Sequence, residues 1–421
     1  MWHCRLLFGS KSHCCKILLI SPLPCTGLIM IKDIHLSTII AGLIAVLVSY
    51  SGPLAIFFQA ARSADIDPQM MTSWVFAISI GAGISGIVLS IVYRTPIITA
   101  WSAPGTALLV TLFPQLSLNE AVAAYITAAI IIFFIGISGL FDKIVNIIPA
   151  SVAAAMMAGI LFNFGLSAFE ALTSTPLLTI AMLVGYVIFK TITNRYSLML
   201  MVVLGGTLSV LFLDSDFTHF SLQIASPTWI TPQWTWSSTL SLALPLVIVS
   251  LTGQFLPGFT ILKTFGYQIA TRPIISFLGL VSIPIAFFGG ITTVIAAITA
   301  PICASSDAHP DENKRYIAGI FNGVFYLLGG IFAGSIVLFF TTFPAQIIAI
   351  IAGLALLGAI FNSLSLALKD TANIDAATIT FMTTASGIEI LGIGSAFWGV
   401  ILGTWIYALL TLLRRMKKTT K

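Results

Sequence analysis

Charged residues are scarce in this sequence. Asp, Glu, Lys and Arg make up only 8% of the chain and hydrophobic residues 58%, whereas soluble domains carry about 25% charged residues. A soluble core could not absorb that much apolar side chain, and apolar runs near the ~20 residues of a membrane span recur along the whole length. The composition excludes a soluble globular protein and predicts an all-α polytopic protein of the lipid bilayer.

Cysteine is also rare, and its distribution argues against a disulfide framework. Four of the five cysteines lie in the first 25 residues, which leaves Cys303 in the body of the chain. Motifs of membrane enzymes are missing too: there is no HExxH, no P-loop, no pair of Asp-rich motifs and no Ser–His–Asp set that could meet at one depth. We therefore expect no enzyme, no cofactor and no metal.

The net charge of +5 does not indicate a nucleic-acid partner. The basic residues are scattered singly between apolar runs and are clustered at the C-terminus, a pattern that reports membrane topology. Residues 1–29 match neither the later spans nor a signal peptide, since they lack an A-x-A-like cleavage site. We expect them to be a dispensable N-terminal extension, with residues 30–421 forming a single transmembrane domain.

Apolar runs predict fourteen transmembrane segments. A polar, tryptophan-rich loop from Asp214 to Trp236 separates a first repeat, residues 30–213, from a second repeat, residues 238–413. Because each repeat has an odd number of spans, the two would insert in opposite orientations, the inverted-repeat plan of many transporters. The expected spans are 36–59, 73–93, 95–113, 119–140, 148–167, 175–190, 197–213, 238–260, 273–288, 289–305, 315–340, 344–366, 374–387 and 391–413.

The basic residues agree with this count. With fourteen spans, every Lys and Arg after Met30 except Arg62 falls on the side of the two termini. Cytoplasmic loops carry such an excess, so both termini are expected in the cytoplasm of a multi-pass protein of the inner membrane. Losing or adding one span would destroy the asymmetry.

The third expected span is broken at its centre. Pro96 to Ser102 has an extended character, and Pro104 then opens a short apolar helix as a first-turn residue. Irregular backbone at membrane depth requires protein or a water-filled cavity around it, and N–H groups at a helix start suit an anion or a polar oxygen. The break predicts a binding site, although a proline-kinked ordinary span is the alternative.

The tenth span, from Phe288 to Ser305, is the repeat partner and is broken as well. Gly289 and Gly290 interrupt it, and Ile291 to Val294 is β-branched and extended in character. We expect a second short helix to begin near Thr292 or Thr293, either of which could cap it. Two half-helix starts would then face each other near the bilayer midplane. Such a site predicts a substrate with a compact polar or anionic group and an apolar body.

A few intramembrane polar residues are candidates for this site. Tyr50 and Ser51 in span 1 and Gln254 in span 8 lie at repeat-related depths, although their hydrogen bonds could equally join helices. Glu170 and Glu389 lie at the outer ends of spans and are candidates for proton coupling, with interfacial solvation as the alternative. The substrate-binding candidates are Tyr50, Ser51, Ser102, Ala103, Pro104, Gly105, Thr106, Gln254, Thr292 and Thr293.

Several sequence motifs of this chain resemble those of the benzoate transporter family (BenE), whose members are proton-linked importers of benzoate. The likeness runs from about Leu36 to Arg415, and its most specific words are Thr99–Gly105, Ile148–Ser151, Ala158–Leu161, Ala296–Ala300, Asp307–Asp311, Gly323–Leu327, Thr384–Gly387 and Leu391–Gly399. The resemblance implies the fold shared with uracil permease and sulfate-permease-type carriers, in which spans 1–4 and 8–11 form a core and spans 5–7 and 12–14 a gate. Family members commonly carry a histidine and an asparagine where this chain has Ile291 and Val294.

The resemblance also implies a function. It predicts a secondary active transporter that imports benzoate or a similar aromatic carboxylate with protons by alternating access. Ile291 and Val294 leave open a different ligand or a benzoate site that does without those two polar groups. The alternatives are a carrier of a nucleobase or another small organic anion, and a non-transporting receptor or channel. The expected partners are the carboxylate, protons and lipid, with a homodimer left open.

Overall fold

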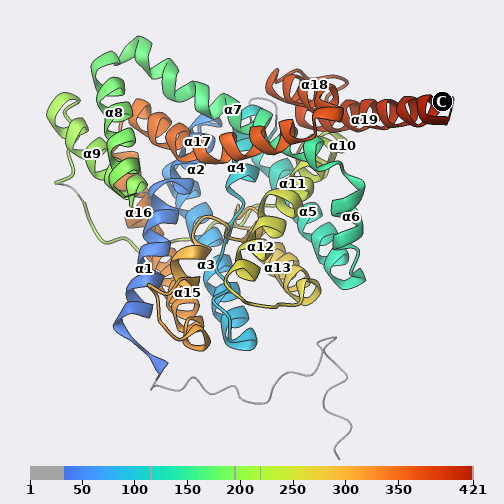
Figure 1. The fold of residues 1–421 in the computed structure, drawn as a ribbon. Coiled ribbons are helices and arrows are strands. Elements are labelled where there is room, and N and C mark those ends of the chain that lie inside the picture. Colours follow the sequence, from blue (N-terminus) through green and yellow to red (C-terminus); the bar gives the residue numbers. More distant parts are fainter. Residues whose placement is uncertain (1–32, 114–115, 194–195, 219, 420–421) are drawn as a thin grey trace, which may run out of the picture.

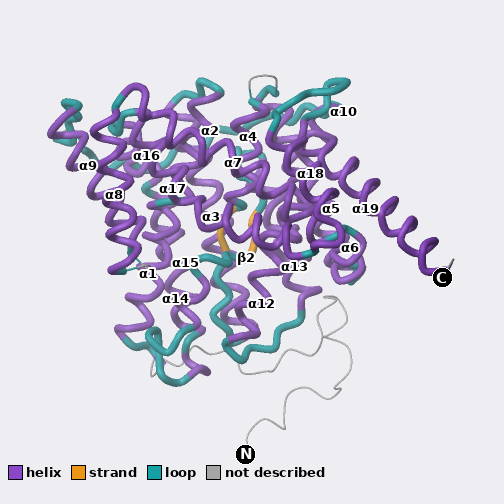
Figure 2. The backbone as a smooth tube through the Cα atoms, turned by 45° about the horizontal axis from the view of Figure 1, so that its top comes forward, coloured by secondary structure: helices purple, strands orange, loops and turns teal. Residues whose placement is uncertain are grey.

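The computed structural model describes residues 33–113, 116–193, 196–218 and 220–419 (Figure 1). The expectation for residues 1–29 lies outside these ranges. The described chain is almost entirely helical, and two strands of three residues each lie at the centre of the molecule (Figure 2). The prediction of an all-α polytopic membrane protein is therefore confirmed.

The first half of the chain runs to Phe212. Its elements are α1 (Leu36–Ser51), α2 (Pro53–Ser63), α3 (Pro68–Tyr93), β1 (Thr99–Trp101), α4 (Ala103–Leu112), α5 (Leu118–Ser138), α6 (Phe141–Ile147), α7 (Ala150–Ser174), α8 (Pro176–Ile192) and α9 (Ser197–Phe212).

The described residues between α9 and α10 form a long connection without helix or strand, as expected from their polar sequence. The second half comprises α10 (Trp236–Ser238), η2 (Thr239–Ala243), α11 (Leu244–Ser250), η3 (Leu251–Phe255), α12 (Leu256–Thr264), α13 (Thr271–Ala286), β2 (Thr293–Ile295), α14 (Ala300–Ala304), η4 (Glu312–Lys314), α15 (Tyr316–Ile331), α16 (Ala333–Thr341), α17 (Ala345–Lys369), η5 (Thr371–Asn373), α18 (Ile374–Ala385) and α19 (Ser395–Thr419).

Local sequence signals explain where many of these helices begin. Asp67 caps α3 by accepting a 2.9 Å hydrogen bond from the Met70 amide, and Pro68 follows it in the first turn. Ser117 and Glu120 form a reciprocal capping box at the start of α5. Gly52 separates α1 from α2, where Pro53 starts a new helix inside the first expected span.

Seven helical segments in the described part of the chain are long and apolar enough to cross a bilayer. A bent pair, Glu312–Ile331 with Ala333–Thr341, adds an eighth candidate broken by 72°. Shorter apolar helices lie between them, among them α4, α8, α9 and α13. The polytopic membrane architecture is established, whereas fourteen spans remain a prediction because the shorter helices fall below the ~20 residues of a full crossing.

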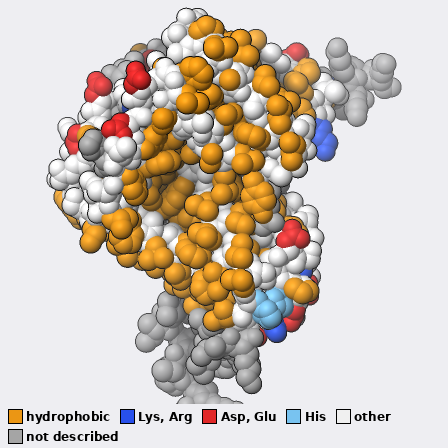
Figure 3. Space-filling model, turned by 90° about the vertical axis from the view of Figure 1, so that its left-hand side faces the viewer, with side chains coloured by type: hydrophobic (Ala, Val, Ile, Leu, Met, Phe, Trp, Pro, Cys, Tyr) orange, Lys and Arg blue, Asp and Glu red, His pale blue; other side chains and the backbone are white. Residues whose placement is uncertain are grey.

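The surface agrees with this assignment. The face that includes α8, α9 and α1 is largely apolar and is hollowed at its centre (Figure 3). Acidic side chains lie near its upper left edge, histidine and basic side chains near its lower edge, and further charged side chains at its right margin, while the hollowed apolar centre shows none (Figure 3).

Helix packing links the halves of the chain. α7 packs along α17, α3 along α15, and α13 along α5. Contacts between α1 and α14 have a counterpart between α11 and α4. Each half therefore completes its packing with elements of the other half, and the two strands lie where these contacts converge.

Candidate functional site

The two strands form an antiparallel pair at the centre of the molecule (Figure 2). Thr99 pairs with Ile295, Ala100 with Val294 and Trp101 with Thr293. Hydrogen bonds of 3.0 Å from the Ser102 amide to the Thr292 carbonyl and of 2.9 Å from Ala296 to Ile98 extend the ladder at both ends. The pairing satisfies extended backbone that would otherwise lie bare at membrane depth.

The expected break in span 3 is confirmed, but the helix start expected in span 10 is wrong. Thr292 and Thr293 do not begin a helix, because Thr293 belongs to β2 and α14 starts only at Ala300. β-Branched residues favour a strand when a partner strand is available, and β1 supplies that partner. Pro301, a first-turn proline, was the overlooked signal of the true helix start.

Ser102 accepts most of the hydrogen bonds that the first residues of α4 can donate. Its side-chain oxygen accepts from the Gly105 amide at 3.2 Å, and its carbonyl accepts from the Thr106 amide at 2.9 Å and from Thr106 Oγ1 at 3.0 Å. Pro104 has no N–H. The expected row of N–H donors is thus reduced to the Ala103 amide, an N1 donor that has no partner within its own helix.

Side chains from the second half of the chain cover this helix start. A β-carbon at Gly105 would collide with Leu246 of α11 and would lie 3.1 Å from Ile291 Cδ1. Ala103, Pro104, Gly105 and Thr106 are all buried. The start of α4 is therefore closed on every side in this conformation.

Thr292 and Thr293 lie close to the same point but bond different helices. Thr292 Oγ1 lies 3.4 Å from Ser250 Oγ of α11, and the Thr293 amide donates to Ser282 Oγ at 2.9 Å. Thr293 Oγ1 is buried without a hydrogen-bond partner. Ser250 was not among the predicted site residues, although the motif Val249–Gly253 resembles Val48–Gly52 in the first half of the chain.

An aromatic cluster, Tyr50, Trp101 and Tyr326, lies beside β1. The Tyr50 ring stacks on Trp101 at 6.1 Å and meets Tyr326 edge-on at 5.7 Å between ring centroids. The Tyr50 hydroxyl bonds Ser79 Oγ of α3 at 2.7 Å. Trp101 Nε1 is buried without a hydrogen-bond partner. The sequence pointed to Tyr50 but not to the two rings that pack on it.

Two other predicted residues occupy different surroundings. Ser51 Oγ donates to the Leu47 carbonyl of its own helix at 2.6 Å, so its hydroxyl is satisfied locally. Gln254 lies half-buried in the π-helical segment η3, and the neighbouring Gly253 packs against Met157 of α7. Gln254 thus lies on the helix segment that contacts α7.

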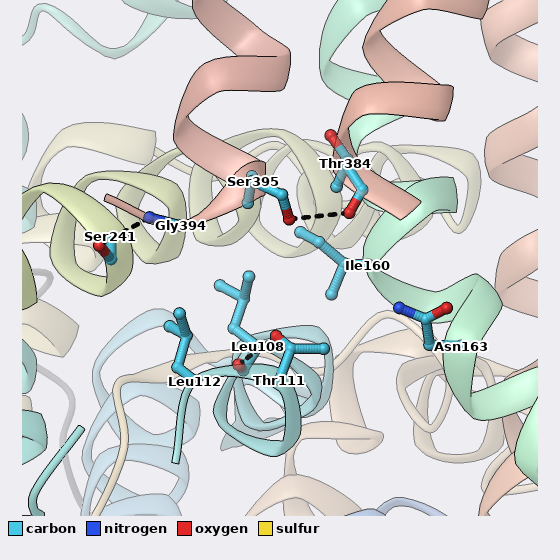
Figure 4. Close-up of a pocket in the computed structure, with 10 residues that line it drawn as sticks. Leu108, Thr111, Leu112, Ile160, Asn163, Ser241, Thr384, Gly394 and Ser395 are labelled. Atoms are coloured by element: carbon cyan, nitrogen blue, oxygen red, sulfur yellow. Dashed lines mark hydrogen bonds between the residues drawn. The ribbon is translucent and has the colours of Figure 1, made fainter. Parts of the chain in front are cut away.

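A small pocket adjoins the far half of α4 (Figure 4). It has a cavity volume of only about 10 Å³ and lies between α4, α7 and the ends of α18 and α19. Polar groups frame it: the Gly394 amide donates to Ser241 Oγ at 2.9 Å, and Ser395 Oγ donates to the Thr384 carbonyl at 2.9 Å. The lining residues are Leu108, Thr111, Leu112, Ile160, Asn163, Ser241, Thr384, Gly394, Ser395 and Ala396.

The two glutamates considered for proton coupling lie away from the strand pair. Glu170 is exposed in the last turns of α7, and Glu389 is exposed in the connection between α18 and α19. The residues of β1 and β2, in contrast, are buried, except that Ala100 is half-buried. Among the residues that the structure describes, no group of three His, Cys, Asp or Glu side chains could hold a metal ion.

The loop between α14 and α15 holds the end of α14 in place. Arg315 is only 9% exposed and donates to the carbonyls of Ala304, His309 and Pro310 at 2.8, 2.7 and 3.3 Å. The Asn313 amide donates to the Asp311 carboxylate, and this hydrogen bond keeps the pKa of Asp311 below its usual range. The arginine thereby satisfies the carbonyl of the last residue of the half-helix.

Comparison with known proteins identifies the family. A family model described as a benzoate membrane transport protein matches residues 32–409. The benzoate membrane transport protein of Acinetobacter baylyi is 54% identical over 379 residues, which cover 90% of this chain and 96% of that protein. The inner membrane protein YdcO of Escherichia coli is 41% identical over 376 residues, covering 89% of this chain and 96% of that protein.

Solved structures share the fold at low sequence identity. The overall structure of SLC26A9 gives a TM-score of 0.62 at 14% identity over 91% of this chain, which spans 66% of that longer protein. The transmembrane domain of the cyanobacterial bicarbonate transporter BicA gives 0.56 at 15% identity, covering 89% of this chain and 98% of that domain. The predicted transporter, rather than an enzyme, is confirmed, and the chain belongs to the benzoate membrane transport family.

Proposed function

We propose that the protein imports benzoate or a similar aromatic carboxylate together with protons, by alternating access. The observation that carries the proposal is the buried antiparallel pair of β1 and β2, which we call the β1–β2 crossing. In this chain of the benzoate membrane transport family, the crossing leads directly into the half-helix α4. Broken spans of this kind mark substrate sites in secondary transporters.

The substrate is expected to lie where α4 begins. Its polar end meets the Ala103 amide and the hydroxyls of Thr106, Thr292 and Thr293, while Ser102 and the Pro104–Gly105 turn hold the helix start in place. Its ring packs against an apolar wall made by Leu246, Ile291 and Val294. Tyr50, which stacks on Trp101, borders the proposed site from span 1. Ser51 and Gln254, from spans 1 and 8, lie in other surroundings in this conformation and stay predictions.

The closed packing around Gly105 supports an occluded conformation. We assign α1–α5 and α10–α16 to a core and α7–α9 and α17–α19 to a gate, as the resemblance implied. The pocket in Figure 4 lies where α4 of the core meets α7, α18 and α19 of the gate. Movement between core and gate would widen this pocket into a path to the site.

The packing supports two inverted repeats of seven spans. Exchanging the halves turns the α3–α15 contact into the α13–α5 contact and the α1–α14 contact into the α11–α4 contact. An internal twofold relation of the chain produces such pairs.

Proton coupling is required for accumulation because an anion entering a negative-inside cell costs roughly 2.3 kcal/mol per 100 mV.

A competition experiment separates the proposal from its rivals. Uptake of labelled benzoate by cells expressing the protein should be saturable and should be inhibited by other aromatic carboxylates but not by uracil. Inhibition by uracil alone would indicate a nucleobase carrier, and binding without flux would indicate a receptor. Flux that does not saturate would indicate a channel.

A further inference from the structure

We infer that the substrate carries the coupled proton on its own carboxyl group, so that the species held at the β1–β2 crossing is the neutral aromatic acid. This inference rests on the proposed function and names the protonation state of the ligand at the same site. It follows from three features of the crossing: its hydrogen-bond donors, its distance from cationic side chains and the titratable groups around it.

The first feature is the shortage of donors at the start of α4. An ionised carboxylate has about four acceptor positions and is held well by two or three N–H groups. Ser102 already binds the amides of Gly105 and Thr106, and its own amide binds Thr292. One backbone donor, from Ala103, is too few for an anion removed from water.

Two further buried groups suit a carboxylic acid. Trp101 and Thr293 are opposed in the strand ladder and lie 3% and 1% exposed. Trp101 Nε1 and Thr293 Oγ1 have no hydrogen-bond partner. The indole offers one donor, while the hydroxyl can donate or accept. A neutral acid, with one O–H donor and a carbonyl acceptor, matches this set.

The second feature is the position of the cations. The lysines and arginines of the described chain lie in loops, near helix ends or in the short helix α6, and none belongs to β1, α4, β2 or α14. Arg94 at the end of α3 bonds the Tyr316 hydroxyl at 3.1 Å, and Arg62 at the end of α2 bonds the Phe343 carbonyl at 2.8 Å. An anion at the crossing would therefore be buried without a counter-charge, which is strongly unfavourable.

The third feature is the set of titratable groups that face the crossing. They are Tyr50 of α1, Cys303 of α14 and Tyr326 of α15. Ordinary tyrosines and cysteines titrate near pH 10 and 8.5, so these groups stay neutral at pH 7. Glu170 and Glu389 are exposed elsewhere. The substrate is then the group at this depth whose proton can be exchanged with either compartment.

The step balances simply. Outside, the carboxylate takes a proton from hydronium to give the acid and water; the acid crosses in the site and returns the proton to water inside. One proton moves with each substrate, and no net charge crosses. With a carboxyl pKa near 4, the acid is about one part in 10³ at pH 7, so the apparent affinity should fall tenfold for each pH unit above that pKa.

Calorimetric titration of the purified protein with three ligands tests this directly. Benzoate should bind with uptake of one proton and should weaken about tenfold between pH 6 and 7. Benzamide, which stays neutral, should bind equally at both pH values without proton uptake. Benzenesulfonate, which stays anionic, should not bind. Benzenesulfonate binding that strengthens as the pH falls, or pH-independent benzoate binding, would overturn the inference.

A matched pair of variants tests the position of the acid. Trp101→Phe removes the indole donor and should weaken both benzoate and benzamide at least fivefold, whereas Trp234→Phe, at a site 57% exposed, should leave both unchanged. Equal affinities in the two variants would overturn the assignment to the crossing. The proposed function fails separately, if benzoate is not transported at all; transport with the wrong ligand or pH pattern contradicts only this inference.

Discussion

Ser102 determines which hydrogen-bond donors at the start of α4 remain available to a ligand. It caps the helix, and Ser117 caps α5 in the same way at an exposed position. Replacing either serine by alanine should lower the free energy of unfolding by about 1 kcal/mol. Only Ser102→Ala should also lower benzoate uptake several-fold, because it loosens the substrate site. Thermal unfolding and uptake per amount of protein check this, and an equal loss of uptake in both variants would contradict it.

Gly105 provides a steric test of the same site. Gly105→Ala places a methyl group against Leu246 and Ile291 and should reduce uptake more than tenfold. Gly358→Ala is the control, because a β-carbon there meets nothing within 4 Å. Full uptake by the Gly105→Ala protein would show that the start of α4 does not close around the substrate.

Residue patterns predicted one half of the crossing better than the other. Pro104, as a first-turn proline, predicts the start of α4, and the preceding Ser102 is a residue type that commonly caps helices. In span 10, Thr292 and Thr293 have the residue type of a helix N-cap, but Thr293 pairs with Trp101 of β1 and forms a strand instead. The burial of Trp101 Nε1 and the contact of Ser250 with Thr292 depend on long-range packing, which no local pattern records.

At the scale of elements, the short helix α14 depends on Arg315 for its position. Arg315→Gln removes most of the hydrogen bonds to three carbonyls, and each buried acceptor left unsatisfied costs roughly 1–3 kcal/mol. We expect a lower melting temperature and reduced uptake. Lys263→Gln, at an exposed position in the last turn of α12, should change neither quantity. Identical behaviour of the two variants would exclude this role of Arg315.

Element boundaries followed the apolar runs, whereas breaks inside them were mostly missed. The division at Gly52, the π-helical segments η2 and η3, and the 72° bend before α16 have no clear counterpart in hydrophobicity. Gly52 lies against Leu198 of α9 and Ala355 of α17, and η2 contacts α4, α5 and α19, so these breaks lie where other helices pack against the broken segment. Hydropathy predicts which segments lie in the bilayer, but not where packing against a neighbouring helix interrupts them.

At the scale of the whole molecule, the distribution of basic residues predicts the topology. A cysteine at Thr218 should lie outside and one at Glu312 inside, in a chain whose native cysteines are replaced by serine. A membrane-impermeant maleimide should label the first in intact cells and the second only after permeabilisation. Labelling of both positions from outside would contradict the fourteen-span arrangement with cytoplasmic termini.

Accumulation of benzoate in proteoliposomes tests the central claim most directly. Vesicles containing the purified protein should concentrate labelled benzoate when an inward proton gradient is imposed, and should only equilibrate it when the gradient is absent. Protein-free vesicles correct for passive entry of the acid. Accumulation that depends on both protein and gradient is the predicted result. Folded protein that adds nothing to passive entry would contradict proton-coupled import of benzoate.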